Sequence, residues 1–188
     1  MDSRGTVFVV AGPSGAGKDT LIKRALQVVP RARLSISATT RAPREGEEHG
    51  RDYHFLTEDE FDRLVGEGAF LEWARVFSGR YGTLSSDVEK MRDEGIDVIL
   101  EIDVQGALQV KDKLPDARFV FIMPSSLEVL EERLRRRGLD SEPEIGKRLG
   151  IAPKEIEIGK REFDVIIVND ELEKATEELV SVLKGEGV

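Results

Sequence analysis

The sequence of 188 residues contains no cysteine, which excludes both a disulfide framework and a thiolate metal site. It also lacks any apolar stretch near the roughly 18 residues that a membrane-spanning helix needs. Its first residues, MDSRGTVFVV, have none of the features of a signal peptide. We therefore expect a soluble, cytoplasmic protein that makes no membrane contact.

Positive charge is in short supply, because the formal net charge is -9. Nucleic acids and anionic membrane surfaces attract proteins through a broad basic field, so this balance argues against both partners. Any anionic ligand must instead meet a local cluster of arginines. The hydrophobic content of 39% is enough to fill one sizeable core, so we expect a single domain whose oligomeric state the sequence leaves open.

A glycine-rich stretch lies between the apolar run Val7 to Ala11 and a segment of helical periodicity that starts at Leu21. Its nine residues are Gly12, Pro13, Ser14, Gly15, Ala16, Gly17, Lys18, Asp19 and Thr20. The glycines allow backbone N–H groups to approach a phosphate without a Cβ in the way, and the helix N-terminus adds further donors. The lysine can reach the outer phosphates, so the stretch predicts a site for a nucleoside triphosphate such as ATP.

The stretch departs from the GxxxxGK[ST] pattern at one position. Asp19 follows the lysine where a hydroxyl residue usually ligates Mg²⁺, and the hydroxyl comes one position later at Thr20. We predict a Mg²⁺ ion bound with ATP. Two ligands stay open at this point, namely Asp19, directly or through water, and Thr20.

Strands that are nearly all apolar alternate with helices over much of the chain, which predicts an α/β fold with a parallel sheet covered on both faces. The expected strands are Val7 to Ala11, Asp97 to Ile102, Arg118 to Ile122 and Asp164 to Val168. The expected helices include Asp87 to Glu94, Val104 to Lys113 and a closing helix to about Leu183. In such folds ligands bind at the carboxyl ends of the strands, where the glycine-rich stretch lies.

The region between these elements breaks the alternation and predicts a small mixed α/β lobe. We expect strands over Leu34 to Thr40, Tyr53 to Leu56 and Ala69 to Val76, and a turn or loop over Ser78 to Thr83. Thr57 and Glu60 form a capping box that opens a helix. Further on, Ser125 and Glu128 predict a second capping box, and the charged stretch Leu139 to Arg161 predicts a mobile helical hairpin.

A second cluster of candidate ligands lies in the stretch TRAPREGEEHGRDYHFL, Thr40 to Leu56. Arg41 and Arg44 are three residues apart after a strand, so their planar guanidinium groups can converge on one phosphate dianion. The hydroxyl of Tyr53 can reach the same group.

With these residues the chain resembles the guanylate kinase family, and the resemblance runs from the phosphate loop to the last strand. The residues that match its signature are Thr40, Arg41, Arg44, Glu47, Gly50, Tyr53, Phe55 and Leu56. The resemblance implies a three-layer P-loop NTPase core (residues 1–33, 84–124 and 162–188), an inserted GMP-binding lobe (34–83) and a helical lid (125–161). It also implies that the protein transfers the γ-phosphoryl group of ATP to GMP, giving ADP and GDP, in purine nucleotide metabolism.

The resemblance also assigns the GMP site, residue by residue, to Ser37, Arg41, Arg44, Tyr53, Glu72, Tyr81, Thr83 and Asp103. Glu72 suits guanine because a carboxylate accepts from N1–H and the 2-amino group together, whereas adenine offers an acceptor at N1. Ser37 and Thr83 can donate to O6.

On the ATP side the resemblance assigns Arg133 and Asn169, with Asn169 on the adenine side, in addition to the phosphate loop. It implies that the catalytic residues are Lys18, Arg41, Arg137 and Arg148. Glu101 stands among apolar residues in ILEID, so we expect a buried carboxylate with a partner there, either a metal reached through water or the phosphate loop.

Two other functions fit part of the pattern. Ribose 1,5-bisphosphate phosphokinase carries a similar GKD[ST] loop, and Asp19 slightly favours this enzyme as the interpretation. The complete set of GMP ligands favours guanylate kinase much more. Noncatalytic guanylate-kinase-like domains of scaffolding proteins bind phosphopeptides and typically lose the loop glycines and lysine. Here Gly12, Gly15, Gly17 and Lys18 are all present.

The scarcity of amide side chains leads to a prediction about thermal stability. Asn169 is the only asparagine, glutamine occurs only at Gln27, Gln105 and Gln109, and charged residues reach 35%. This balance is typical of thermophilic proteins, so we expect calorimetry to give a melting temperature above about 65 °C. A melting temperature in the mesophile range of about 45–65 °C would contradict the prediction.

Overall fold

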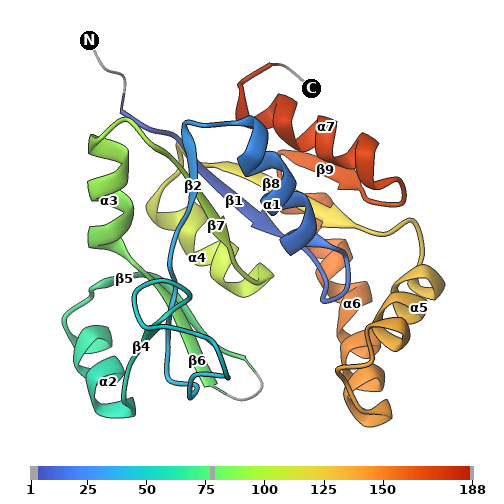
Figure 1. The fold of residues 1–188 in the computed structure, drawn as a ribbon, viewed down its shortest axis with the longest axis horizontal. Helices are drawn as coiled ribbons and strands as arrows, with labels where there is room; N and C mark the ends of the chain where they lie inside the picture. Colours follow the sequence, from blue (N-terminus) through green and yellow to red (C-terminus); the bar gives the residue numbers. More distant parts are fainter. Residues whose placement is uncertain (1–3, 77–78, 187–188) are drawn as a thin grey trace.

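The computed structural model describes residues 4–76 and 79–186. The strands form two separate sheets (Figure 1). The strands are β1 (Val7–Ala11), β2 (Ala32–Leu34), β3 (Ala38–Thr39), β4 (His54–Phe55), β5 (Phe70–Val76), β6 (Gly79–Leu84), β7 (Asp97–Glu101), β8 (Arg118–Met123) and β9 (Val165–Val168). The helices are α1 (Lys18–Val28), α2 (Glu58–Gly66), α3 (Ser85–Asp93), α4 (Val104–Lys113), α5 (Leu127–Arg137), α6 (Glu142–Glu162) and α7 (Leu172–Leu183).

The larger sheet, called the core sheet below, has the strand order β2-β7-β1-β8-β9, and each of its pairs is parallel. β1 lies in the middle and is fully buried. Alternate residues of β1 enter different clusters: Phe8 and Val10 pack with α1 and α7, whereas Val7 and Val9 pack with α3 and α4. The predicted three-layer α/β core is therefore confirmed, with helices on both faces of a parallel sheet.

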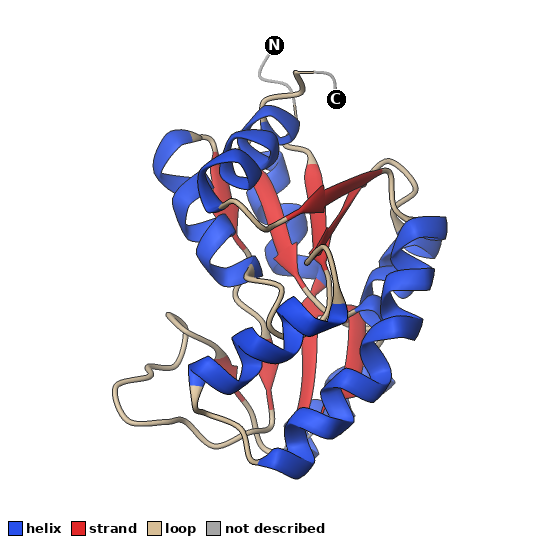
Figure 2. Cartoon of the chain, turned by 90° about the vertical axis from the view of Figure 1, so that its right-hand side faces the viewer, coloured by secondary structure: helices blue, strands red, loops and turns tan. Residues whose placement is uncertain are grey.

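The smaller sheet, with the order β4-β3-β6-β5, mixes parallel and antiparallel pairs. Together with α2 it forms a unit over residues 38–76 and 79–84, called the small lobe below, that extends from one side of the core (Figures 1 and 2). Its own core is built on Ala38, Phe61 and Phe70, with the two aromatic rings stacked 4.5 Å apart. A second mixed sheet is what the predicted inserted lobe required.

Two expected strand boundaries in this region are wrong. Leu34 to Thr40 is not one strand, because β2 ends at Leu34 in the core sheet and β3 begins at Ala38 in the smaller one. Ser35 N still bonds the core strand at Ile99 O, while Ser37 O already accepts from His54 N of the smaller sheet. The chain crosses between the two sheets here, and alternating apolar and polar residues do not reveal which sheet they pair with.

The expected turn over Ser78 to Thr83 is also wrong where the chain is described, since residues from Gly79 onward form β6 and Ser78 lies outside the described residues. Glycines weakened the strand pattern. Gly82 is needed because a Cβ there would lie 2.8 Å from the Phe70 ring and 2.9 Å from Trp73 Cβ.

Two expectations for the region after β8 need correction. The N-cap of α5 is Ser126, whose hydroxyl accepts from Val129 N, so Ser125 and Glu128 do not form a capping box. Leu139 to Arg161 is not a hairpin in itself, because α6 runs unbroken from Glu142 to Glu162 after a capping box that Ser141 and Glu144 form. The hairpin is made by α5 with α6, which pack through Leu130, Leu134, Ile145 and Ala152.

Other local predictions are confirmed. Thr57 and Glu60 form the capping box of α2 with both of its hydrogen bonds. The last strand and closing helix are present as β9 and α7. In the described part of the chain, the helices are all too short or too polar to span a lipid bilayer.

A glycine in α6 allows the C-terminal end of this helix to approach the core sheet, and this contact can be tested. A Cβ on Gly159 would lie 2.5 Å from the ring of Phe121, which is fully buried in β8. We expect Gly159→Ala to lower the free energy of unfolding by about 1–3 kcal/mol in chemical denaturation, because the buried ring must move. Gly150→Ala, in the same helix but with open space around it, is the matched control and should raise stability by up to about 1 kcal/mol. Equal effects at both positions would contradict the close contact.

Candidate active site

The loop after β1 is folded tightly against its neighbours. Gly15 and Gly17 have φ values of 92° and 89°, in the left-handed region that favours glycine. A Cβ on Gly12 would lie 1.9 Å from the carbonyl oxygen of Ile122 in β8. A Cβ on Gly17 would meet the Asn169 amide at 2.5 Å. The three glycines are thus required by the conformation and close packing of this loop.

Lys18 folds back over this loop. Its Nζ donates to the carbonyl oxygens of Gly12, at 2.7 Å, and Pro13, at 3.3 Å. Burial lowers the pKa of the lysine, while the nearby carboxylates of Glu101 in β7 and Glu155 in α6 oppose that shift. An anion in this position would replace part of the water that the ammonium group has lost.

Asp19 lies in the first turn of α1 and faces Glu101, at the end of the neighbouring strand β7. Burial, and next the negative charge of Asp19, raise the pKa of the Glu101 carboxyl well above its usual range. Of the two expected partners of Glu101, the structure shows a contact at the end of the phosphate loop, where α1 begins, and a metal reached through water stays a prediction. Thr20 is exposed at the start of α1.

Three predicted ATP-side residues are tied to the phosphate loop. The guanidinium group of Arg148, on α6, donates to the hydroxyl of Ser14 and, at 3.0 Å, to Asp140. Asn169 is 5% exposed, and its side-chain amide donates to Ala16 O at 2.8 Å. The backbone carbonyl oxygen of Asn169 accepts from Arg133 of α5 at 2.6 Å. Asn169 thus supports the loop in this structure, and its contact with adenine stays a prediction.

The predicted guanine-facing residues meet where the small lobe joins the core. Glu72 of β5 is 4% exposed and pairs in register with Thr83 of β6, whose hydroxyl donates to Glu72 Oε1 at 2.7 Å. Asp103 caps α4 by accepting from Gly106 N at 2.7 Å. A Cβ on Gly106 would lie 2.4 Å from Glu72 Oε2, so α4 lies directly against this carboxylate. Burial raises the pKa of Glu72 to about 7, although the Thr83 hydrogen bond opposes the shift.

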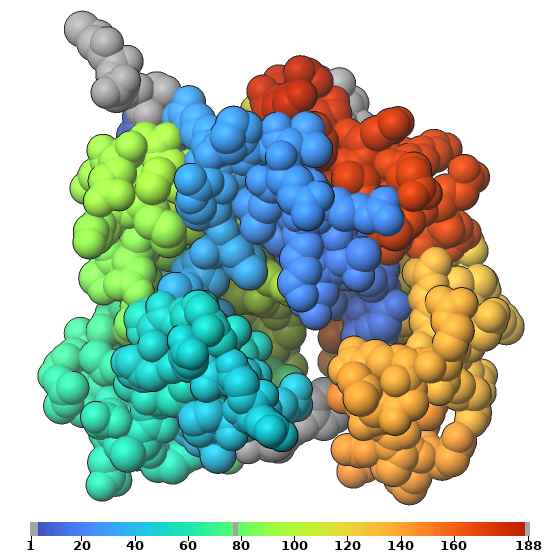
Figure 3. All heavy atoms as spheres, in the orientation of Figure 1, coloured from blue at the N-terminus to red at the C-terminus, as the bar shows by residue number. Residues whose placement is uncertain are grey.

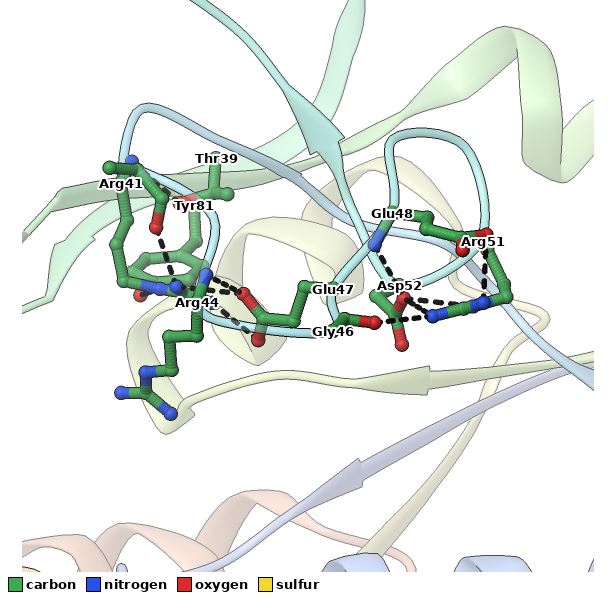
Figure 4. A network of polar contacts seen from close by, with 10 residues as sticks. Thr39, Arg41, Arg44, Gly46, Glu47, Glu48, Arg51, Asp52 and Tyr81 are labelled. Carbon is green, nitrogen blue, oxygen red and sulfur yellow. Dashed lines mark hydrogen bonds and ion pairs between the residues drawn. The ribbon is translucent and has the colours of Figure 1, made fainter.

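The predicted phosphate-binding residues of the small lobe form a second group (Figure 4). Arg41 Nε donates to the Tyr81 hydroxyl at 3.2 Å, and its guanidinium group lies 5.3 Å from the centre of the Tyr53 ring. Tyr53 and Tyr81 are in edge contact at 6.0 Å. Tyr81 and Thr83 are two residues apart on β6, so this strand links the guanine-facing residues to the phosphate-binding ones.

The structure thus collects most of the predicted site residues into three groups, around the phosphate loop, Glu72 and Arg41. Figure 3 shows an open groove between the small lobe and the α5–α6 pair, with the blue N-terminal part of the chain at its upper end. Ser37 lies at the entry to β3 and is half-buried. Arg137 and Arg44 are exposed, and within the described residues their guanidinium groups make no hydrogen bond or ion pair.

Sequence reasoning missed the contacts of three acidic residues here. Glu47 binds Arg41, Asp140 binds Arg148, and Glu155 faces Lys18. Glu47 was visible only as a match to the family signature. Asp140 and Glu155 stand in a charged stretch whose pattern does not show which side of α6 meets the phosphate loop.

A phosphate loop after the central strand of a parallel sheet, with arginines both in the small lobe and on the α5–α6 pair, defines a P-loop phosphotransferase of the nucleoside monophosphate kinase type. Comparison with known proteins narrows this class. The guanylate kinase family profile matches residues 4–186, so the chain belongs to the guanylate kinase family.

Individual relatives agree over nearly the whole chain. The chain is 48% identical to a guanylate kinase of Rubrobacter xylanophilus, with 96% of this chain and 94% of the relative covered. It is 45% identical to one of Caldanaerobacter subterraneus subsp. tengcongensis, covering 99% and 90%. A crystal structure of guanylate kinase from Anaplasma phagocytophilum superposes with a TM-score of 0.75 at 33% identity and covers 98% of this chain and 87% of that one.

The raised pKa of Glu72 predicts how pH affects stability. The folded chain holds this proton up to about pH 7, whereas in the unfolded chain the carboxyl has its ordinary pKa of 4.5. The contribution of Glu72 to the free energy of unfolding therefore falls as pH rises from its pKa in the unfolded chain towards its pKa in the folded chain. The fall is about 2 kcal/mol between pH 5.5 and 8. We expect Glu72→Gln to remove that part of the pH dependence in urea denaturation. The free energy of unfolding of the variant should therefore increase relative to that of the wild type as pH rises. A difference that stays constant with pH would show that Glu72 is ionised throughout.

Proposed function

We propose that the protein transfers the γ-phosphoryl group of ATP to the phosphate of GMP, giving ADP and GDP. The observation that carries this proposal is that the fold combines a lysine-bearing phosphate loop after β1 with a buried carboxylate, Glu72 of β5, that accepts from Thr83. Membership of the guanylate kinase family supports it. The reaction places the protein in purine nucleotide metabolism, and we propose a cytoplasmic location.

Guanine selection is assigned to Glu72, Ser37, Thr83 and Asp103. In its ionised form Glu72 accepts from guanine N1–H and the 2-amino group, and the base replaces the water that burial has removed. Adenine presents an acceptor at N1, so it would leave the carboxylate buried without its partners. The Ser37 and Thr83 hydroxyls are the proposed donors to O6.

The phosphate of GMP is assigned to Arg41, Arg44, Tyr53 and Tyr81. It is already mostly dianionic at pH 7, since the second pKa of a phosphate monoester is about 6, so its oxygen needs no strong general base. The arginines fix the direction of this oxygen towards the donor. Alignment and charge stabilisation are then the protein's main tasks in phosphoryl transfer.

The triphosphate of ATP is assigned to the loop Gly12 to Thr20, with Arg133 and Asn169 behind it. Lys18 changes its partners from the Gly12 and Pro13 carbonyl oxygens to phosphate oxygens, and its charge stabilises the transferring group. Arg148 already reaches the loop through Ser14, and the exposed Arg137 at the C-terminal end of α5 is the proposed second arginine of this side. With Arg41 these residues are the proposed catalytic set.

The residues around the loop fit a hard divalent cation, which prefers carboxylate and hydroxyl oxygens. Two carboxyl groups, of Asp19 and Glu101, face each other, and the Thr20 hydroxyl is exposed nearby in the same helix turn. We propose that Asp19 holds Mg²⁺ directly or through water, with Thr20 as the alternative ligand. When bound with ATP, the ion supplies neutralising charge to the phosphates.

We also propose that residues 34–83 act as the GMP-binding lobe and residues 125–161 as a lid, on a core of 1–33, 84–124 and 162–188. The open groove between the two in Figure 3 suits a protein that closes when both substrates are bound. Closure would exclude water, which otherwise competes with GMP for the phosphoryl group.

The role of Lys18 can be tested by removing its ammonium group. We expect Lys18→Ala to cost several kcal/mol of transition-state stabilisation, seen as a fall in kcat of roughly 100-fold or more in a coupled assay of ADP formation. Lys23→Ala, an exposed lysine in the same helix, is the control and should keep its activity. Unchanged turnover in Lys18→Ala would remove the lysine from the mechanism.

The guanine assignment can be tested through specificity. Glutamine at position 72 presents one donor and one acceptor, so one of the two guanine donors loses its partner. We expect Glu72→Gln to raise KM for GMP about 10- to 100-fold and to reduce the preference for GMP over AMP. Glu94→Gln, an exposed carboxylate, should behave like the wild type. Full discrimination against AMP in Glu72→Gln would refute the assignment.

A further inference from the structure

The two arginines of the proposed GMP phosphate site differ in how many donors they have free. Arg41 has a side chain 10% exposed. Its Nε donates to the Tyr81 hydroxyl, Nη1 donates to Ala42 O and Glu47 Oε2, and Nη2 donates to Glu47 Oε1, at 2.7 to 3.2 Å. A guanidinium group has five N–H donors, so these four bonds leave a single one for a ligand.

Glu47 accepts two of these four hydrogen bonds, more than Tyr81 or Ala42. Its carboxylate is 20% exposed, binds Arg41 through both oxygens at 3.0 Å, and also accepts from the backbone N–H of Arg44 at 2.7 Å. The backbone N–H of Glu47 donates in turn to Arg44 O at 3.1 Å, and Gly46 takes a φ of 83° between them. One side chain therefore fixes both the Arg41 guanidinium group and the turn that carries Arg44.

Arg44 is in the opposite situation. It is exposed, and in the described part of the chain its guanidinium group has no hydrogen bond or ion pair. In Figure 4 its side chain extends away from Glu47, while its backbone nitrogen is joined to that carboxylate. Its whole planar fork is available to a phosphate.

We propose that Glu47 is a positioning residue that divides the work between the two arginines. It fixes the Arg41 guanidinium group, which donates to the Tyr81 hydroxyl and keeps one N–H for the ligand. It also fixes the turn that carries Arg44, so that the Arg44 guanidinium group can bind the acceptor phosphate through two hydrogen bonds. This inference rests on the proposed GMP site and adds to it the residue that organises its phosphate end.

Replacing Glu47 by glutamine separates this role from a general structural one. The amide keeps the size of the side chain, but its NH₂ group faces an Arg41 N–H and cannot accept from it, so the two-oxygen contact is lost. Arg41 then changes partners and the turn at Arg44 loosens. Guanosine carries the base but no phosphate, so its binding does not use either arginine.

The experiment measures KM for GMP, KM for ATP, the inhibition constant of guanosine against GMP, and the melting temperature. For Glu47→Gln we expect KM for GMP to rise about tenfold, as when charge-assisted hydrogen bonds are lost, with the guanosine constant and KM for ATP unchanged. Glu45→Gln, an exposed carboxylate in the same loop, is the matched control and should leave all four values as they are. Arg44→Lys keeps the charge without the fork and should also raise KM for GMP about tenfold with guanosine unaffected.

Several results would overturn the inference. A lower KM for GMP in Glu47→Gln would make Glu47 a competitor of the phosphate, and an unchanged KM would leave it without a role. An equal weakening of GMP and guanosine, or a much lower melting temperature, would make its role structural only. If guanosine did not compete with GMP in the wild type, the proposed GMP site itself would be wrong. That result comes from the unchanged protein, so it is distinct from any effect of the Glu47 and Arg44 variants.

Discussion

The nucleotide end of the molecule depends on how the carbonyl oxygens of the phosphate loop are occupied. Gly12 O and Pro13 O accept from Lys18, Pro13 O also accepts from Ala16 N, and Ala16 O accepts from Asn169. When Lys18 turns to a phosphate, Pro13 O and Ala16 O still have these other partners, so an anion at the loop meets N–H groups and the ammonium group. The loop can keep this shape only because Gly12 and Gly17 have no Cβ to push against β8 and Asn169.

The acceptor end depends on the opposite kind of group, a carboxylate in a dry place. Glu72 is buried against α4 and keeps its proton until about pH 7, so its ionised form is costly until a ligand with paired donors arrives. Such a group is selective because the wrong base leaves that cost in place. The register of β5 with β6, which sets Glu72 opposite Thr83, is therefore as important to the site as the residues themselves.

The core and the family could be predicted from the sequence because their signals are local. The apolar runs of β1, β7, β8 and β9, the glycines of the loop and the capping box of α2 each depend on residues close together in the chain. The failures share one cause, which is contact between distant segments. Leu34 to Thr40 was divided by pairing with two sheets, β6 was hidden by a glycine that Phe70 and Trp73 require, and the pairs Glu47–Arg41 and Asp19–Glu101 depend on how side chains point.

The central claim is that one groove brings the phosphate tail of ATP to a guanine nucleotide. The most direct measurement is a coupled assay of the purified protein with Mg²⁺ and ATP that compares GMP, AMP, UMP and ribose 1,5-bisphosphate as acceptors. We expect GMP to be phosphorylated far faster than the other three, with GDP as product. Transfer mainly to ribose 1,5-bisphosphate, or none to GMP, would contradict the account.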